Sequence, residues 1–245
     1  MNPSSRHPWH RQLHPFGLYG ARGSRELDRA AIENFGIPGE TLMEIAGTRA
    51  ADWIQQHELP NAEGIILAGK GNNGGDAYVV ARLLHEYGIQ VQVFSLVQVS
   101  SLTEDALLNA QRWLSLGGEI TVFLDADEEN KEAHLEKIKV ESVKLSLNKT
   151  AKTHFSKALA TADFIVDGLL GIGINGPVSA SHEEIINLVN KATNASMIHK
   201  YALDIPSGLH PDTGRCMGSA FSVDFTFCFG GIKPGYFLEE GPTFC

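Results

Sequence analysis

The feature of this sequence that most constrains its fold is a series of short apolar segments separated by helical patterns. Apolar segments occur at residues 64–69, 89–96, 118–124, 163–171, 197–204 and 224–231. Between them lie amphipathic stretches, such as residues 103–116 and 181–192, with apolar residues near a 3.6-residue period. Strands that alternate with helices of about 10–15 residues predict βαβ units. The expected fold class is therefore α/β, with a doubly wound, mostly parallel central sheet.

The chain is expected to form one domain, residues 21–245, after a flexible tail of residues 1–20. The tail contains prolines, two arginines and no acidic residue, and it lacks the apolar core of a signal peptide, so a targeting segment stays open as an alternative. Residues 24–35 predict a helix with Ser24 as its N-cap and acidic residues in its first turn. A second predicted helix follows, and the two make an N-terminal helical extension. The charged residues 125–148 predict a surface helix with loops.

Composition argues against several classes of function. Of the 245 residues, 43% are hydrophobic, which is enough for a sizeable core, and the formal net charge is -9. A nucleic-acid interface needs clustered lysine and arginine, so none is expected, whereas a nucleotide held by backbone N–H groups fits this charge. No apolar run reaches the ~18 residues that span a bilayer, so we expect no membrane association. The three cysteines lack Cys-x-x-Cys spacing, which disfavours a disulfide framework or zinc site and favours the cytoplasm.

Three of the predicted strands end in loops that are polar or rich in glycine. These loops are residues 69–76 (GKGNNGGD), 166–177 (VDGLLGIGINGP) and 203–208 (LDIPSG). Ligands of open α/β sheets bind outside the carboxyl ends of the strands. Because the strands are expected to be parallel, the three loops should meet at one edge of the sheet, and that edge is the predicted functional site.

The first loop has the spacing Gly-x-Gly-x-x-Gly, at Gly69, Gly71 and Gly74, which is typical of dinucleotide-binding folds. That pattern also requires an acid about 20 residues later to hold a ribose hydroxyl, and the segment VFSLVQVSS offers none. Lys70 precedes the glycines, so the loop is not of the G-x-x-x-x-G-K-[ST] phosphate-binding kind. Asp76, predicted in the first helical turn, would repel a pyrophosphate. An ordinary dehydrogenase is therefore disfavoured.

Each polar residue of these loops also has a purely structural interpretation. Asp76 would stabilise a helix N-terminus, by about 0.5 kcal/mol. Asp167 would cap the loop of residues 168–171, and Asp204 would form the turn before the following proline. Ser207 would hydrogen-bond the backbone of that turn. The functional interpretation rests on their occurrence beside asparagines and glycines, since glycine lets a ligand approach backbone N–H groups closely.

The same loops contain a set of oxygen ligands without nitrogen or sulfur. Asp167 offers a carboxylate, the neighbouring asparagines offer amide oxygens, and the loops offer hydroxyl and backbone oxygens. Oxygen ligands suit a hard cation rather than a transition metal. A single carboxylate favours a monovalent over a divalent ion.

Five blocks of the sequence resemble the signature segments of the NAD(P)H-hydrate epimerases. They are GIPGETLMEIAGTRAA, GKGNNGGDAYVVARLL, DFIVDGLLGIGINGPVS, ALDIPSGLHPDTG and FGGIKPGYFLEEGP, in that order, and the resemblance covers residues 18–245. It implies a Rossmann-like three-layer αβα sandwich. It also implies an isomerase of metabolite repair, which interconverts the R and S forms of NADH and NADPH hydrated at carbon 6 of the nicotinamide ring. Both hydrates share that ring, so no preference between them follows.

The resemblance implies roles for individual residues. Asp204 would bind the substrate and transfer the proton, while Asn73, Asp167 and Ser207 would bind a K⁺ ion. Besides Asp204, the substrate-binding residues would be Asn72, Asn73, Gly74, Gly75, Asp76, Gly171, Ile172, Gly173, Ile174, Asn175, Gly176 and Pro177. Replacing Asp204 with Asn is then expected to abolish epimerisation and to leave folding intact.

The resemblance further implies a functional partner, an ATP- or ADP-dependent dehydratase that acts on the S form, and a homodimeric assembly. The sequence departs from the family at two places. Some relatives carry a basic residue where this chain has Asn175, which puts a catalytic lysine there in doubt. Relatives usually continue beyond the position of Cys245, so we expect either a truncated domain end or a missing fused dehydratase.

Two other functions are weighed against the epimerase. A non-catalytic relative would keep the fold as a protein-interaction or nucleotide-binding module, but such a module has no need of all three polar loops. An unrelated Rossmann oxidoreductase is disfavoured because the ribose-binding acid is missing.

Overall fold

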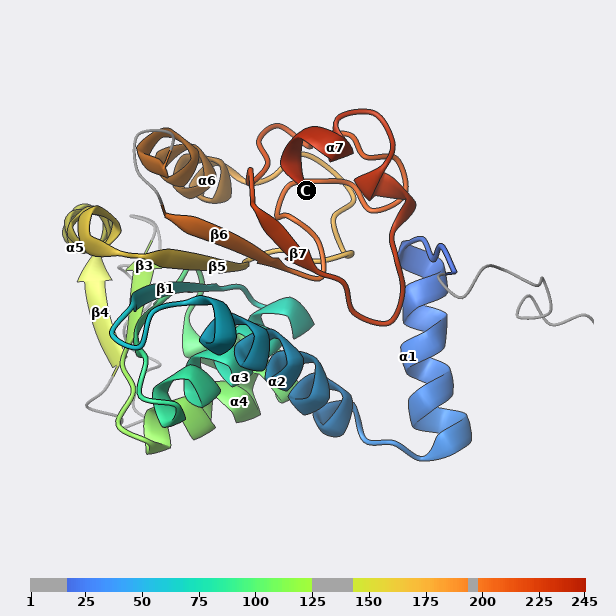
Figure 1. Cartoon of the computed structure of the whole chain (residues 1–245), viewed down its shortest axis with the longest axis horizontal. Coiled ribbons are helices and arrows are strands. Elements are labelled where there is room, and N and C mark those ends of the chain that lie inside the picture. The colour runs from blue at the N-terminus through green and yellow to red at the C-terminus, as the bar shows by residue number, and fades with distance from the viewer. Residues whose placement is uncertain (1–16, 125–142, 194–197) are drawn as a thin grey trace, which may run out of the picture.

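The computed structural model describes residues 17–124, 143–193 and 198–245. Within these ranges, seven strands form one sheet in the order β4-β3-β2-β1-β5-β6-β7 (Figure 1). The strands are β1 Glu63–Ala68, β2 Gln90–Ser95, β3 Ile120–Leu124, β4 Val143–Leu147, β5 Phe164–Gly168, β6 His199–Leu203 and β7 Phe225–Phe227. Every neighbouring pair is parallel, so the predicted fold class and sheet are confirmed.

Helices cover both faces of the sheet. One face carries α2 (Gly39–His57), α3 (Asn72–Glu86) and α4 (Glu104–Ser115), and the other carries α5 (Asn148–Thr161) and α6 (Ala180–Thr193) (Figure 1). Successive side chains of a strand point to opposite faces. Accordingly, Ile66 of β1 packs in the core under α2, α3 and α4, whereas Ile65 and Leu67 pack in the core under α5 and α6. The predicted three-layer αβα sandwich is confirmed.

The order of the strands reverses between β1 and β5. From β1 the chain builds outward to β2, β3 and β4, and it then returns to place β5 against the other side of β1. The loops that follow these two central strands are thereby brought together, and Gly69 N–H donates to the Gly168 carbonyl at 3.0 Å. Such a reversal leaves a crevice at the carboxyl ends of the strands. The fold therefore places the first two predicted loops at one topological switch point.

The prediction for the outer edge of the sheet is wrong in part. Residues 143–147, expected within a surface helix with loops, form β4 and pair in parallel with β3. Their sequence, Val-Lys-Leu-Ser-Leu, alternates apolar and polar residues with the period of a strand, so the signal was present. Residues 125–142, the rest of that predicted surface helix, lie outside the described residues.

Helix α5 has no counterpart among the predicted elements. It buries Ala151, Phe155, Ala158 and Leu159 under the sheet, a spacing of four, three and one residues that places them on one helical face. The alanines make this face weakly hydrophobic, which is why the pattern is easily overlooked.

No helix in the described part of the chain is long and apolar enough to cross a membrane.

Two predicted helix starts are shifted. Helix α1 spans Ala21–Phe35 with Gly20 as its N-cap and no acid in its first turn, so Ser24 is an internal residue, 4% exposed. Its N–H donates to the Gly20 carbonyl at 3.0 Å. At the start of α6, the hydroxyl of Ser179 accepts the His182 N–H at 3.4 Å. Both helices therefore begin earlier than predicted, α1 at Ala21 and α6 at Ala180.

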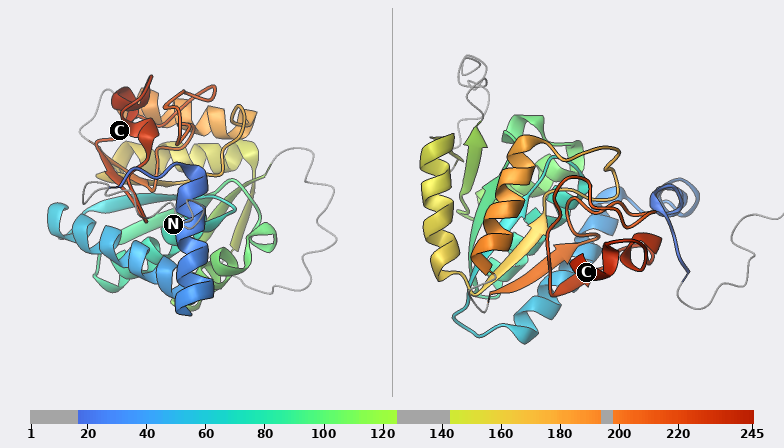
Figure 2. Two further views of the ribbon diagram at one scale, coloured as in Figure 1. Left: turned by 90° about the vertical axis from the view of Figure 1, so that its right-hand side faces the viewer. Right: turned by 90° about the horizontal axis from the view of Figure 1, so that it is seen from above.

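Helix α1 lies at one end of the molecule, apart from the two helical layers (Figures 1 and 2). Its attachment begins before the helix, because Leu18 forms a parallel β-bridge with Ile232 and Tyr19 N–H donates to the Ile232 carbonyl at 2.8 Å. The chain is thus packed against the C-terminal segment from residue 18 onward. The predicted tail otherwise falls on residues 1–16, which lie outside the described residues.

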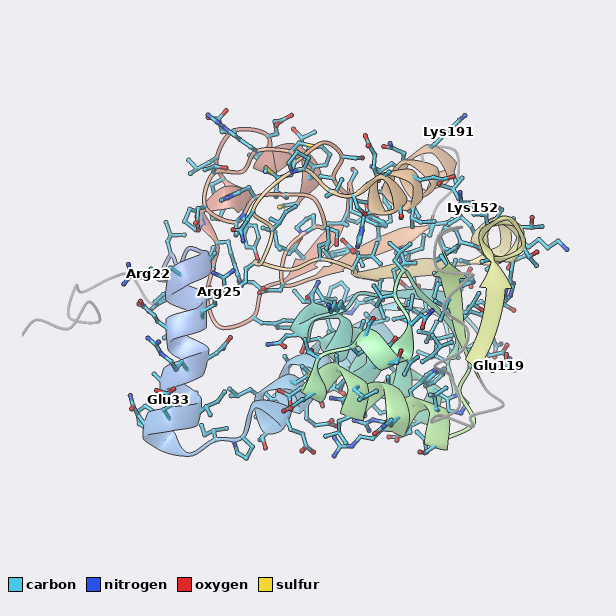
Figure 3. The ribbon with its side chains drawn as sticks, turned by 180° about the vertical axis from the view of Figure 1, so that it is seen from behind. Arg22, Arg25, Glu33, Glu119, Lys152 and Lys191 are labelled. Carbon is cyan, nitrogen blue, oxygen red and sulfur yellow. The ribbon has the colours of Figure 1, made fainter. Side chains whose placement is uncertain are left out.

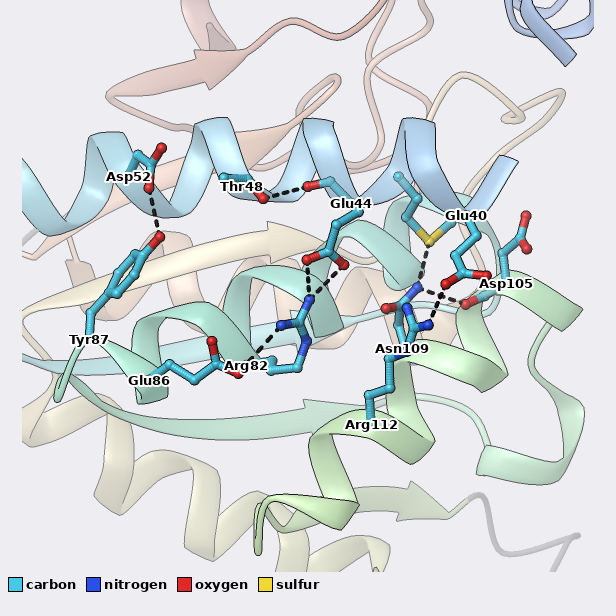
Figure 4. Close-up of polar contacts among 11 residues, drawn as sticks. Glu40, Glu44, Thr48, Asp52, Arg82, Glu86, Tyr87, Asp105, Asn109 and Arg112 are labelled. Carbon is cyan, nitrogen blue, oxygen red and sulfur yellow. Dashed lines mark hydrogen bonds and ion pairs between the residues drawn. The ribbon is translucent and has the colours of Figure 1, made fainter. Parts of the chain in front are cut away.

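Ion pairs join the three helices of one layer (Figure 4). Arg82 of α3 pairs with Glu44 of α2 at 2.6 Å and with Glu86 at 3.4 Å, and Arg112 of α4 pairs with Glu40 of α2. These residues line a groove of about 610 Å³ on the outer side of the layer. None of the predicted site residues lines it, so this groove is separate from the crevice at the strand ends.

Candidate active site

The loop after β1 leads directly into α3. The helix begins at Asn72, with Gly71 as its N-cap and no acid in its first turn. Asp76 is therefore the fifth helical residue. It does not lie in the first turn, where the sequence pattern had predicted it. A carboxylate one turn inside a helix gains little from the free N–H groups at the end. The interpretation of Asp76 as a helix-end stabiliser is wrong.

The glycines of this loop serve mainly close packing of the backbone. A Cβ at Gly69 would overlap the Leu169 carbonyl, and a Cβ at Gly74 would overlap the Gly69 carbonyl. A Cβ at Gly75 would lie 2.5 Å from the sulfur of Met43. Close packing therefore gives a steric reason for Gly74 and Gly75, and access of a ligand to the N–H groups of this loop stays a prediction. Only Gly71 faces open space.

Asn73, Asp167 and Ser207 come together from three different strand ends, and we call them the oxygen cluster. Ser207 donates its hydroxyl to Asp167 Oδ1 at 2.6 Å and its N–H to Oδ2 at 2.7 Å. The Asn73 amide donates to the Leu170 carbonyl at 2.9 Å, and the Ser207 hydroxyl lies 3.2 Å from the same carbonyl. The three residues assigned to a cation by resemblance are thus linked to one another, Asn73 and Ser207 through the Leu170 carbonyl and Ser207 and Asp167 directly.

The structural interpretations of Asp167 and Ser207 also describe real contacts. Asp167 Oδ1 accepts the Leu169 N–H at 3.2 Å, and the Ser207 hydroxyl accepts the Leu170 N–H at 2.8 Å. These bonds order the loop after β5. They do not compensate the charge of Asp167, which is 1% exposed.

The electrostatics of the oxygen cluster fit a hard cation. Burial raises the pKa of Asp167 to about 6, and the hydrogen bonds from Ser207 and Leu169 only partly oppose this. The buried Oδ1 of Asn73 has no hydrogen-bond partner among the described residues. An orphaned amide oxygen beside an unpaired carboxylate is a suitable ligand set for such an ion. No group of three or more His, Cys, Asp or Glu suited to a metal occurs in the described ranges.

Asp204 sits at the end of β6 in a left-handed backbone conformation, with φ at 61°. Aspartate tolerates this region better than most residues do. Its carboxylate accepts the Phe229 N–H at 3.3 Å and forms an ion pair with Lys233, and its carbonyl accepts the Tyr236 hydroxyl. The side chain is thus fixed from several directions, as a proton-transfer group should be.

Lys233 was not among the predicted site residues. Its side chain is fully buried, with 0% exposure, and it also donates to the Phe229 carbonyl at 2.7 Å. The sequence does contain a signal: Gly-Gly-Ile-Lys-Pro-Gly places a lone lysine in an otherwise uncharged run within one of the five blocks of resemblance. A lysine is almost never fully buried unless it is paired. Its partner across the fold could not be read from the chain order.

Two more carboxylates act on this ion pair. Asp76 is 8% exposed, and its carboxyl group interacts electrostatically with Asp204, with Asp28 of α1 and with Lys233. Burial first, and then the charges of Asp204 and Asp28, raise the pKa of Asp76 well above its ordinary value. We call Asp28, Asp76 and Asp204 the carboxylate cluster.

Helix α1 forms one wall of this region. Arg25 extends toward the body of the protein, whereas Arg22 lies on the outer side (Figure 3). The Arg25 guanidinium donates to the Ile172 carbonyl at 3.1 Å, within the predicted substrate loop of residues 171–177. A Cβ at Gly230 would lie 4.0 Å from Asp28 Oδ1, which places α1 against the segment that carries Lys233. No pattern in the sequence indicates that α1 reaches the site.

The substrate loop itself is anchored at one end and open at its centre. Ile172 packs beside the small core of Ile205, Leu209 and Tyr236. A Cβ at Gly171 would lie 3.3 Å from Asn73, next to the oxygen cluster. Gly173 and Gly176 face open space, and Asn175 is exposed. The loop therefore borders both clusters and leaves room for a ligand.

The chain is similar to known proteins along most of its length. The family model described as "YjeF-related protein N-terminus" matches residues 39–235. The chain is 34% identical over 212 residues to an NAD(P)H-hydrate epimerase of Rhodopirellula baltica, covering 86% of this chain and 74% of that protein. It is 31% identical over 220 residues to an NAD(P)H-hydrate epimerase of Limosilactobacillus fermentum, covering 90% and 88%.

Another relative is longer. The chain is 34% identical over 221 residues to the bifunctional NAD(P)H-hydrate repair enzyme Nnr of Moorella thermoacetica, which accounts for 89% of this chain but only 37% of that enzyme. Among solved structures, that of the yeast protein ynu0 matches with a TM-score of 0.69 at 19% identity, over 91% of this chain and 85% of that one. This likeness supports the fold. The match of the family model over residues 39–235, with relatives above 30% identity along most of the chain, shows that this protein belongs to the family of YjeF-related protein N-termini.

Proposed function

We propose that this protein is an NAD(P)H-hydrate epimerase, an isomerase that interconverts the R and S forms of NADH and NADPH hydrated at carbon 6 of the nicotinamide ring. The observation that carries the proposal is the fixed ion pair of Asp204 and Lys233, set beside the oxygen cluster at the switch point of the sheet. Epimerisation at a carbon that bears both a hydroxyl and a ring nitrogen needs groups that give and take protons. The curated relatives that carry the name epimerase support the same reaction.

Asp204 is the residue to which we assign proton transfer at carbon 6. The carboxylate is held by the Phe229 N–H and by the buried Lys233 ammonium, so its position changes little when a ligand binds. Burial raises the pKa of Asp204 above its ordinary value, while Lys233 opposes this and favours the ionised form. Two routes fit such a group: reversible loss of the hydroxyl, or opening of the ring at carbon 6. Addition at the opposite face completes the inversion in both.

We propose that the nucleotide lies between the first turn of α3 and the loop of residues 171–177. The free N–H groups at the start of α3 suit phosphate oxygens, and they now have no carboxylate in the same turn to oppose an anion. Asn72 at this helix end is exposed, as are Asn175 and Pro177 in the loop. These exposed residues, with the glycines at 173 and 176, provide the contacts that we assign to the ribose and phosphates.

The functional assay supplies the R hydrate of NADH together with an S-specific, ATP- or ADP-dependent dehydratase. The dehydratase alone consumes the R hydrate only as fast as the R hydrate converts spontaneously to the S hydrate. Addition of this protein is expected to accelerate the clearance well above that rate, measured by the return of NADH absorbance. A lack of acceleration, with or without potassium, would contradict the epimerase and favour a non-catalytic binding module.

We propose that Asn73, Asp167 and Ser207 hold a K⁺ ion. The supporting observations are the orphaned Asn73 Oδ1 and the buried, uncompensated carboxylate of Asp167. When bound, the ion supplies positive charge that orders this corner of the nucleotide site. Within the chain, Asp167 and Ser207 in turn order the loop after β5 through Leu169 and Leu170.

Potassium is expected to stabilise the native protein through Asp167. At a K⁺ concentration of about 100 times the dissociation constant, the gain is about 2.7 kcal/mol, or roughly 5–10 °C in Tm for a domain of this size. Asp167→Asn keeps the shape of the side chain and removes the charge, so its Tm should not respond. The measurement is thermal unfolding in potassium chloride against tetramethylammonium chloride at equal ionic strength. Equal responses of the two proteins would rule out an ion at this cluster.

We further propose that a hydrate dehydratase is the functional partner, which accords with relatives named as bifunctional repair enzymes. The three cysteines are free, which is consistent with a cytoplasmic location.

We also expect a homodimer. Its support is the exposure of large apolar residues on the first two helices, with Phe35 79% and Ile45 54% exposed.

A further inference from the structure

Asp76 is a buried carboxyl group in the site to which the proposed mechanism assigns no step. The residue is only 8% exposed. Burial and neighbouring charges set the pKa of Asp76, and no other described residue donates a hydrogen bond to its carboxyl group. A buried carboxylate without a partner is costly, and the group avoids that cost by remaining protonated.

The charges around Asp76 favour the protonated form. Lys233 is the one cation that acts on the carboxylate cluster among the described residues, and it is paired with Asp204 and the Phe229 carbonyl. Asp28 faces the cluster from α1 and adds negative charge. The α2 and α4 residues found close to Gly75 and to the Asp76 carbonyl, which are Met43, Gly47 and Ala106, are uncharged. One cation therefore faces three carboxyl groups.

Asp76 and Asp204 differ in environment in the way that separates an acid from a base. Asp204 has a direct ammonium partner and a backbone N–H donor, which favour its ionised form. Asp76 has neither, and the ionised Asp204 repels a second negative charge. In other enzymes, two carboxyl groups whose pKa values are separated by their environments act as the acid and the base.

We propose that Asp76 is the proton donor of the epimerisation and Asp204 the proton acceptor. The inference rests on the proposed function and deepens it by giving the reaction two catalytic carboxyl groups instead of one. The two groups come from different elements, the start of α3 and the end of β6.

The step balances as follows for loss of the hydroxyl. The Asp76 carboxyl transfers its proton to the hydroxyl on carbon 6, the C6–O bond breaks, and water leaves with the electron pair. The lone pair of ring nitrogen N1 forms the N1=C6 double bond. Water then adds to the opposite face of C6, the π electrons return to N1, and the surplus proton of the water passes to Asp204. A proton returns from Asp204 to Asp76 through solvent, and no oxidant or reductant is needed.

The first test is the pH profile of kcat for the wild-type protein in the coupled assay. Asp76 acts as an acid, so kcat should fall as pH rises through its raised pKa. Asp204 acts as a base, so kcat should fall as pH drops through its own pKa. Asp76→Asn keeps the shape but holds no acidic proton, and we expect kcat to fall by about 100-fold or more with KM changed by less than about threefold. Its residual activity should lack the alkaline limb.

A neighbouring variant tests the electrostatic argument without altering either carboxyl group. The charge of Asp28 raises the pKa of Asp76, so Asp28→Asn should lower that pKa and move the alkaline limb to lower pH. A role of Asp76 in structure alone predicts no movement. This measurement holds even if Asp76→Asn fails to fold.

Unfolding gives an independent readout. Between the unfolded pKa of about 4 and its raised native pKa, Asp76 binds a proton only in the native state. Native stability should therefore decline as pH rises through this window, and Asp76→Asn should decline less. Full kcat in folded Asp76→Asn, with the alkaline limb intact, would overturn the proposal while leaving the epimerase standing. Absence of epimerisation in the wild type would instead overturn the proposed function.

Discussion

Asp204→Asn is expected to abolish turnover and to lower the free energy of unfolding by about 3–5 kcal/mol. Removal of one partner of a buried ion pair leaves the other as an uncompensated charge, and Lys233 has 0% exposure. The sequence alone predicts an inactive but normally folded variant. The backbone gives no reason to change this, since Asn also suits the left-handed conformation at this position. The buried lysine changes that expectation, because the loss of activity and a loss of stability should appear together.

A double variant separates the two effects. Asp204→Asn combined with Lys233→Met removes both charges, so it should be more stable than Asp204→Asn and still inactive. The measurements are urea unfolding and the coupled assay, on the wild type and the Asp204→Asn, Lys233→Met and double variants. If the two single effects on stability simply add, the ion pair does not contribute as the structure indicates.

Gly74→Ala is expected to destabilise the fold by about 3 kcal/mol or more. The added methyl group would overlap the backbone carbonyl of Gly69, and a backbone atom between β1 and α3 cannot move aside as a side chain can. The displacement would propagate to Asn73, which precedes it in the helix and belongs to the oxygen cluster. The loss should be visible as a lower urea midpoint.

Gly71→Ala is the matched control in the same loop. Its Cβ would meet no atom within 4 Å, and φ is -97°, which alanine adopts without strain. We expect a loss of less than about 1 kcal/mol, from the poorer N-cap. If both variants were equally stable, the glycines would serve ligand access, as the sequence first suggested, rather than packing.

Much of the fold could be predicted because its signals are local. Strands β1 and β5 are largely apolar runs, and β6 ends in three buried residues; each leads into a polar loop, which is the pattern of buried parallel strands. Where the local signal is weak, the prediction fails. Helix α5 buries two alanines in its core face, and β4 is a short edge strand whose lysine and serine interrupt its apolar residues.

The site divides in the same way. Asp167, Asp204 and Ser207 could be proposed from sequence because each lies at or near the end of a predicted strand, and parallel strands bring their carboxyl ends to one edge. The role of Asp76 could not be predicted. It depends on where α3 begins, four residues before Asp76, and on which charged groups lie near its carboxyl group. Helix propensity sets such a boundary only to within a few residues.

By itself, the sequence determined the parallel α/β sandwich, the edge at which the loops converge and the resemblance that the family match bears out. Only the tertiary structure decided which charges face one another. Lys233 meets Asp204 across 29 residues, and Asp28 arrives from a helix that precedes the span of the family model. Hydrophobic periodicity is a property of neighbouring residues and can be read along the chain. An electrostatic environment depends on distance and burial, and these exist only once the chain has folded.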